Sequence, residues 1–236
     1  MSGEQRRAPR GTLRLHKVKR NVQQRMDGTV LLADLEDDSA ALAFLDPQYR
    51  AVLDKMAYGN EDARQKRRAT MQAMTDSTIS IFVREIERVL KPSGHLILWM
   101  DKFTLLEGHF VIWLSQAPTL TRVDLMNWNN LRFGMGKRTR KVTEYAAIFQ
   151  KPPIRAKGIW TDHSIRDSWP EMSDRDIHPH AKPRVLTERL IRAVTRKGDL
   201  VVDPCAGGYG VLDACIASGR EFVGCDLMEA PDAAKA

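Results

Sequence analysis

A carboxylate, a backbone carbonyl and an aromatic ring fall within four residues of this sequence, at Asp46-Pro47-Gln48-Tyr49, directly after an apolar run. The exocyclic amine of a nucleic-acid base is a weak nucleophile because its lone pair is conjugated with the ring. Asp46 and the carbonyl of Pro47 could accept its N–H bonds and favour the tetrahedral nitrogen that attack requires. Tyr49 could stack on a base turned out of its helix. A plain Asp-Pro turn with a packing tyrosine is the alternative that this motif alone leaves open.

A second group of chemically capable residues lies at 203–210, DPCAGGYG, where an apolar run meets a glycine-rich turn. Glycine lets the backbone approach a ligand closely, and the following helix N-terminus favours a negative group. Asp203 could engage an ammonium, and Asp226 could take both ribose hydroxyls of an adenosine cofactor. The GxGxxG fingerprint is missing, which favours a cofactor with an amino-acid tail over a dinucleotide. A structural turn in which Asp203 caps the helix is the alternative.

The elements that would position these groups alternate along the chain. Apolar runs of strand length predict strands, and the run at 41–45 is typical of a strand buried on both faces of a sheet. Helical spacing of apolar residues predicts helices. The alternation indicates an α/β fold with a mostly parallel sheet. We expect strands at 29–33, 41–45, 95–100, 121–128, 142–149, 199–203 and 221–226, and helices at 79–90, 110–114, 185–194 and 211–217.

Together the two motifs resemble the amino-methyltransferases of DNA, which act on adenine N6 or cytosine N4. That family carries D/S/N-P-P-Y/F/W after one strand and D-P-F-x-G-x-G after another. The order here, with the glycine turn near the C-terminus, resembles the permuted β group. Similar segments stand at 30–34 (VLLAD), 136–149, 178–183 (HPHAKP) and 219–227. The resemblance implies a Rossmann-like class I methyltransferase fold, circularly permuted, with an antiparallel hairpin and flanking helices.

The resemblance implies methyl transfer from S-adenosyl-L-methionine to a base amine in double-stranded DNA, with adenine N6 as the first expectation. Cytosine N4, adenine in RNA, single-stranded DNA and an inactive DNA-binding relative are the alternatives. It also implies roles for single residues. We expect catalysis by Asp46, Pro47 and Tyr49, and cofactor binding by Asp34, His178, Lys182, Asp203, Cys205, Gly207, Gly208 and Asp226. We expect nucleic-acid contacts by Arg50, Arg64, Lys66, Arg67, Arg68, Lys137, Arg138 and Arg140.

Three positions depart from the family pattern. Gln48 replaces the usual second proline, and Cys205 replaces the usual phenylalanine. Tyr209 stands where the family has glycine, so the sequence leaves open how the cofactor turn is built. Pro204-Cys205 also matches the Pro-Cys nucleophile of cytosine C5-methyltransferases. That interpretation is disfavoured because this cysteine lies inside the glycine turn.

The charge of the chain is unevenly distributed. The formal net charge is +7, and residues 1–25 hold eight basic side chains against one acid. The rest of the chain is balanced, with 29 basic and 29 acidic side chains. A basic arm on a neutral body suits contact with a phosphate backbone. A solubilising tail is the alternative.

The chain length predicts one methyltransferase domain at 26–236 after a flexible basic arm at 1–25. Segments 50–78 and 151–177 are candidate substrate-contacting inserts, and their small size predicts short or relaxed sequence specificity. The three cysteines form no CxxC pair, so neither a zinc module nor a disulfide framework is expected, and we expect no metal site. No run approaches the length of a membrane span. We expect a cytoplasmic protein, with a homodimer left open.

Overall fold

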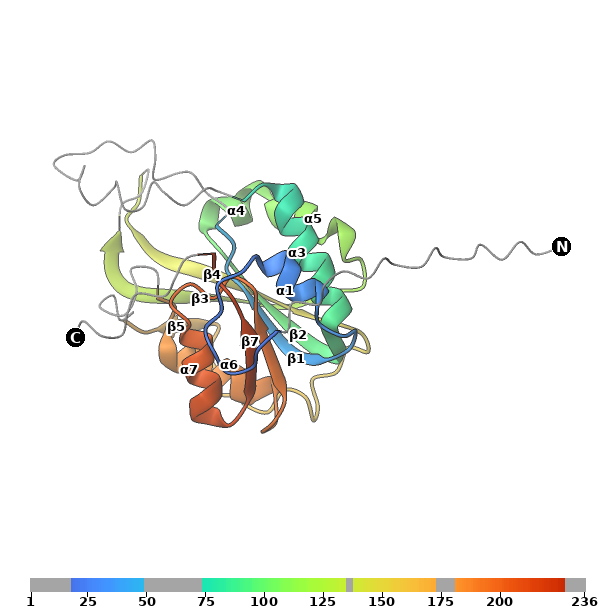
Figure 1. Ribbon diagram of the computed structural model, residues 1–236. Coiled ribbons are helices and arrows are strands. Elements are labelled where there is room, and N and C mark those ends of the chain that lie inside the picture. Colours follow the sequence, from blue (N-terminus) through green and yellow to red (C-terminus); the bar gives the residue numbers. More distant parts are fainter. Residues whose placement is uncertain (1–17, 49–73, 135–137, 173–180, 228–236) are drawn as a thin grey trace.

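The computed structural model describes residues 18–48, 74–134, 138–172 and 181–227. Its centre is a seven-stranded sheet in the order β5-β3-β4-β2-β1-β6-β7 (Figure 1). The strands are β1 (Ala40–Leu45), β2 (Leu90–Met100), β3 (Thr121–Gly134), β4 (Lys141–Gln150), β5 (Ser168–Pro170), β6 (Leu200–Asp203) and β7 (Glu221–Gly224).

Four neighbouring pairs of strands are parallel, and the pairs β2–β4 and β3–β4 are antiparallel. The mostly parallel sheet with one antiparallel hairpin is the predicted fold. β1 lies inside the sheet, between β2 and β6, and every one of its residues is buried. Its side chains alternate between the two faces: Ala43 and Leu45 enter one apolar core, while Leu42 and Phe44 enter the other. The unbroken apolar run at 41–45 follows from this double burial.

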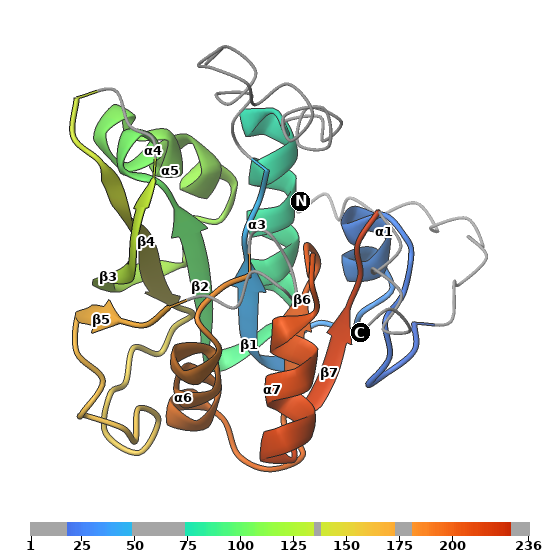
Figure 2. The same ribbon diagram turned by 90° about the vertical axis from the view of Figure 1, so that its left-hand side faces the viewer.

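Helices cover both faces of the sheet (Figures 1 and 2). One layer contains α1 (Gly28–Ala33), α3 (Asp76–Val89), α4 (Lys102–Glu107), α5 (His109–Trp113) and the short 3-10 helix η2 (Leu114–Gln116). The opposite layer contains α6 (Arg184–Val194) and α7 (Gly210–Ser218), which pack on each other. In α3 and α6 the buried side chains recur at helical spacing, as the sequence predicted. The α4 helix and the β5 strand were not predicted.

The strand predicted at 29–33 is wrong, because this segment forms the α1 helix. Asp27 caps the helix, and its side chain accepts a hydrogen bond from the backbone N–H of Thr29. Leu31 and Leu32 are fully buried in the core that α1 shares with α3. The apolar run reads equally well as a short strand or as one turn of buried helix, and the cap together with the packing decides for the helix.

Two segments predicted as an arm and as an insert partly lie against the body. Within 18–25, the N–H of Asn21 donates to the carbonyl of Phe222 in β7. The backbones of Arg25 and Asp226 pair in an isolated parallel β-bridge. Within 151–172, β5 pairs with β3, and Trp160 and Trp169 pack against the core between the sheet and α6. Of the HPHAKP segment, residues 181–183 precede α6 without forming a helix, and 178–180 lie outside the described residues.

Candidate active site

A cavity of about 970 Å³ opens where β1, β6 and β7 end. β1 and β6 are parallel neighbours, paired through Leu42–Val201 and Ala43–Val202, so their carboxyl ends meet at the same edge of the sheet. The two sequence motifs therefore line one cavity, although more than 150 residues separate them in the chain. The volume is at the upper end of what small-molecule sites occupy, roughly 300–1,000 Å³.

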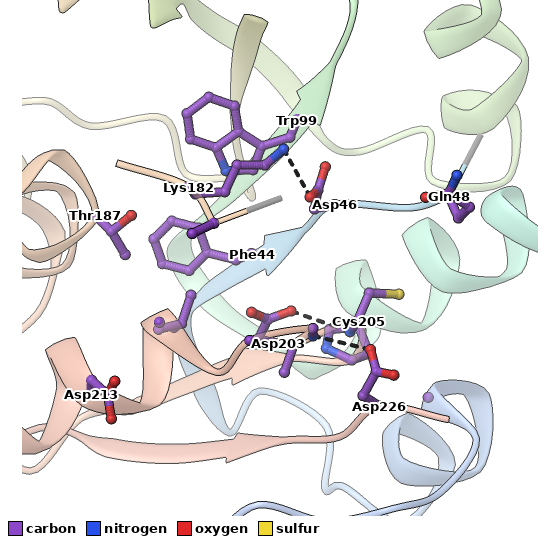
Figure 3. Close-up of a pocket in the computed structure, with 18 of the residues that line it drawn as sticks. Phe44, Asp46, Gln48, Trp99, Lys182, Thr187, Asp203, Cys205, Asp213 and Asp226 are labelled. Atoms are coloured by element: carbon purple, nitrogen blue, oxygen red, sulfur yellow. Dashed lines mark hydrogen bonds and ion pairs between the residues drawn. The ribbon is translucent and has the colours of Figure 1, made fainter. Parts of the chain in front are cut away.

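Asp46 follows β1 directly and lines this cavity. Its carboxylate Oδ2 lies 2.9 Å from Nζ of Lys182, from the segment before α6 (Figure 3). The same Nζ lies 2.9 Å from Oε2 of Glu144 on β4, and 5.2 Å from the centre of the Trp99 ring. Lys182 thus bridges two acids from different strands. Sequence reasoning placed Lys182 with the cofactor, but the described structure pairs it with the predicted catalytic acid.

The three charges perturb one another. Burial raises the pKa of Asp46, and the positive charge of Lys182 opposes that rise. Burial would also raise the pKa of Glu144, but Lys182 and Lys141 outweigh it and hold that pKa well below its usual value. Burial alone would lower the pKa of Lys182, yet its two acidic partners raise it. Lys182 is therefore a permanent cation that helps to keep Asp46 ionised.

The glycine turn after β6 is held by its two acids. Asp203 accepts a hydrogen bond from the N–H of Cys205 at 3.2 Å, and Asp226 accepts one from the N–H of Gly207 at 3.0 Å (Figure 3). Gly207 has φ +48°, which glycine adopts without strain. Burial raises the pKa of Asp203 to about 7, and the nearby Asp46 and Asp226 add to this. A cationic ligand group in the cavity would reverse that effect.

Tyr209 is the departure from the family pattern that the structure explains. It has φ +57°, the left-handed conformation that usually requires glycine, and it caps the start of α7. Its side chain points away from the cavity into the core, where it is 2% exposed and meets Phe222 edge to face. The hydroxyl donates to the carbonyl of Gln24 at 2.8 Å and accepts from the N–H of Gln24 at 3.2 Å. The ring therefore leaves the glycine turn unobstructed, and it anchors residues 18–25 through Gln24.

Cys205, predicted to bind the cofactor, lines the cavity beside Asp203. Burial raises the pKa of its thiol well above the usual value, and the surrounding carboxylates raise it further. A thiol that stays protonated is a poor nucleophile. The environment therefore argues against the alternative in which Pro204-Cys205 attacks a cytosine ring.

The structure adds an acid that sequence reasoning missed. Asp27, the cap of α1, lines the cavity, whereas Asp34, predicted to bind the cofactor, caps the far end of the same helix and is not part of the cavity lining. The prediction for Asp34 rested on placing 30–34 in a strand. A Cβ atom at Gly28 would stand 2.4 Å from the carbonyl oxygen of Pro204, so only glycine lets α1 approach the glycine turn after β6 this closely. The Asp-Gly pair before the apolar run was the available signal.

Other cavity residues come from elements that carry no motif. Phe44 on β1 and Trp99 on β2 supply apolar surface above the glycine turn (Figure 3). Glu171 also lines the cavity, and its carboxylate accepts hydrogen bonds from the N–H groups of Val185 and Leu186 at the start of α6. Their roles depend on strand register and helix position, which the sequence pattern does not reveal.

Several predicted site residues cannot be placed. Those outside the described residues are Tyr49, Arg50, Arg64, Lys66, Arg67, Arg68, Lys137 and His178. Gln48 lines the cavity, and its carbonyl accepts a hydrogen bond from the N–H of Met74 at 2.7 Å. Arg138 and Arg140 are exposed near the turn of the β3–β4 hairpin. Gly208 lies in the cavity lining, as predicted.

Comparison with known proteins identifies the family. A family model described as a DNA methylase, of the N6/N4 methyltransferases, matches residues 40–231. The chain belongs to the N6/N4 DNA methylases. It is 46% identical to the type II methyltransferase M.HhaII of Haemophilus parahaemolyticus over 213 residues, covering 90% of this chain and 93% of that protein. The predicted family is therefore confirmed, and DNA is the substrate of this methylase.

Solved structures support the fold. The TTHA0409 protein of Thermus thermophilus in complex with S-adenosyl-L-methionine superposes with a TM-score of 0.61 at 19% identity, covering 87% of each chain. The PvuII DNA methyltransferase, described as cytosine-N4-specific, superposes with a TM-score of 0.63 at 16% identity, covering 87% of this methylase and 81% of that chain. The predicted class I methyltransferase fold is confirmed.

The cofactor of this family is S-adenosyl-L-methionine, as predicted. The residues present fit it, because Asp27, Asp203 and Asp226 surround the glycine turn with negative charge and the cofactor carries a sulfonium and an ammonium. Among the described residues, no group of three acids, histidines or cysteines could hold a metal ion. Within the same residues, no helix is both long enough and apolar enough to span a bilayer.

Proposed function

We propose that this methylase transfers a methyl group to N6 of adenine in double-stranded DNA, with short or relaxed sequence specificity. One observation carries the proposal: Asp46, at the end of β1, faces the same cavity as the acidic glycine turn that follows β6. This supports the proposal, because methyl transfer needs an acceptor for the amine next to the bound cofactor.

The residues divide into two groups by what they would do. The carboxylate of Asp46 and the carbonyl of Pro47 accept the N–H bonds of the target amine, and Tyr49 stacks on the flipped base. Asp27, Asp203 and Asp226 hold the cofactor together with the backbone of the glycine turn. Bound S-adenosyl-L-methionine supplies an activated methyl group that the amine takes up directly, with no covalent enzyme intermediate.

The charge pattern supports this assignment of roles. An ionised carboxylate is the stronger acceptor for the amine, and burial raises the pKa of Asp46 and so works against ionisation. Lys182, 2.9 Å away, supplies the opposing positive charge. Lys182 is in turn held by Glu144, so the cation does not depend on Asp46 alone for its position.

The choice of adenine is supported by a local relative. Over 56 residues, 24% of this chain, the protein is 41% identical to the DNA adenine methyltransferase YhdJ of Escherichia coli (strain K12). Cytosine N4 is the second candidate, because a cytosine-N4-specific methyltransferase is among the structural neighbours. Both amines need the same acceptors, so the mechanism above serves either base.

The proposed contacts with DNA come from the basic side chains predicted for 50–68 and 137–140, of which Arg138 and Arg140 are exposed in the described structure. The described part of 151–177 folds onto the body through β5 and Glu171. This leaves little of that segment for reading a long site, which supports short or relaxed specificity. A homodimer, and action on single-stranded DNA or RNA, stay untested expectations.

The test incubates the purified protein with unmethylated DNA, or with RNA, and labelled S-adenosyl-L-methionine, and identifies modified nucleosides by mass spectrometry. We expect N6-methyladenine in DNA, whereas N4-methylcytosine would transfer the mechanism to the second candidate. Asp46→Ala removes both acceptor oxygens of this side chain, and should lower turnover about 10²- to 10³-fold with cofactor affinity retained. Parallel loss of turnover and cofactor affinity would contradict the role given to Asp46.

A further inference from the structure

The β3 strand contains a large bulge near the turn of the β3–β4 hairpin. Asn129 faces Thr143, but the next paired residues are Gly134 and Lys141. Five residue steps on β3 therefore lie opposite two steps on β4, and residues 130–133 project from the ladder. Bulges next to active sites commonly redirect side chains, and an insertion this large calls for a functional explanation.

The bulge is held in shape by its own side chains. The side-chain oxygen of Asn129 accepts from the N–H of Leu131, and that of Asn130 accepts from the N–H of Arg132, both at 3.0 Å. Leu131 has φ +57°, a left-handed conformation that is unfavourable for a bulky residue. Strained conformations of this kind persist where the surrounding structure imposes them, and they concentrate at functional sites.

The bulge presents apolar side chains to solvent. Phe133 is 86% exposed and Leu131 is 54% exposed, the former being the most exposed large apolar side chain among the described residues. The surroundings are basic, because Arg138 and Arg140 are exposed on the same hairpin and Nζ of Lys102 donates to Thr139 there. Duplex DNA fits such a surface in two ways. Its phosphates attract the cations, and its stacked bases offer apolar surface to the exposed apolar side chains.

The bulge also lies at the outer end of the hairpin whose β4 strand carries Glu144. Glu144 on β4 pairs with Lys182, which pairs with Asp46. The end of β2, Met100, faces Tyr145, so the part of the hairpin from Glu144 outward extends past β2 at the carboxyl edge of the sheet (Figure 2). Lys141, opposite the end of the bulge, is three residues from Glu144, about 10 Å along the strand.

We propose that the bulge inserts Phe133 as a wedge into the base stack next to the target base, while Arg138 and Arg140 contact the phosphate backbone. Apolar wedges separate neighbouring base steps, and an aromatic ring can replace the stacking that a flipped base gives up. The inference rests on the proposed function, because it assigns to that site the means by which the base leaves the helix.

The test compares Phe133→Ala with the wild-type enzyme on two substrates that carry a methylation site found by mapping. One is a matched duplex, and the other places the target base opposite an abasic site, where it has no pairing partner and leaves the helix more easily. We expect kcat/KM of Phe133→Ala to fall about 5- to 150-fold on the matched duplex, the range that base–aromatic stacking is worth. On the abasic-site duplex the variant should be close to wild type. Phe133→Trp should retain activity on both.

Leu125→Ala is the matched control, because Leu125 is 43% exposed and lies on the regular part of the same strand, away from the bulge. It should leave both substrates unaffected. An equal loss for Phe133→Ala on both substrates, or no loss on either, would overturn the wedge. A wild-type enzyme that methylates neither substrate would overturn the proposed function, and this inference with it. Cofactor affinity, measured separately, should be unchanged in every variant.

Discussion

Removal of the positive charge at Lys182 tests whether this residue keeps Asp46 ionised. The substitution Lys182→Met preserves the length of the side chain and its packing over Trp99, while it deletes the cation 2.9 Å from Asp46. Since Lys182 lowers the pKa of Asp46 and burial raises it, loss of Lys182 should raise that pKa further. In the proposed mechanism the ionised carboxylate of Asp46 is the stronger acceptor for the target amine, so turnover should fall as Asp46 becomes protonated. The acidic limb of the pH profile should therefore move to higher pH.

The size of the shift follows from Coulomb's law at the observed separation. Two unit charges 2.9 Å apart interact by about 1.4 kcal/mol in bulk water and by about 5.7 kcal/mol at an effective dielectric constant of 20. One pKa unit corresponds to about 1.4 kcal/mol. The Asp46 side chain is 33% exposed, so solvent screening keeps the interaction close to the lower limit. We expect the acidic midpoint to rise by about 1–2 pH units.

The assay is kcat/KM for DNA between pH 5 and pH 9, which reports ionisations of the free enzyme. Lys141→Met is the matched control, because Lys141 pairs with Glu144 at 2.8 Å and contributes least to the pKa of Asp46. Its midpoint should move little. The reasoning is refuted if Lys182→Met lowers kcat/KM by the same factor at every pH, with the acidic midpoint unchanged.

Two further predictions concern the cofactor turn. The pKa of Asp203 is raised to about 7 by burial, and a cationic cofactor favours the ionised form, so binding should release a proton and affinity should rise with pH up to about 7 and level off above it. Calorimetry in buffers of different ionisation enthalpy measures the proton, and Asp203→Asn should abolish both effects. Gly28→Ala should lower the free energy of unfolding by about 1–3 kcal/mol, because its methyl group would stand 2.4 Å from the carbonyl oxygen of Pro204. In the same denaturation assay Gly210→Ala should be neutral or stabilising by up to about 1 kcal/mol, since its methyl group meets nothing within 4 Å; equal losses in both variants would contradict the argument.

The sequence was sufficient for the elements whose patterns have one physical interpretation. The apolar run at 41–45 is typical of a strand buried on both faces, and it is the interior strand β1. The spacing in α3 and α6 matches one buried helical face. The prediction from sequence failed at 29–33, because a short apolar run suits either a strand or a helix. There the cap by Asp27 favours the helix. The misplaced role of Asp34 followed from that error.

What the sequence alone determined was the family, through the motif at 46–49 and the acidic glycine turn at 203–210, and with the family the chemistry to be expected. Such motifs are local, because neighbouring residues must act on one ligand together. Only the tertiary structure decided which partners come from elsewhere. Lys182 reaches Asp46 because β1, β4 and the segment before α6 converge, and the bulge at 130–133 exists only relative to its partner strand. Pairings between distant segments depend on strand order and register, and neither can be deduced from residue spacing in a single chain.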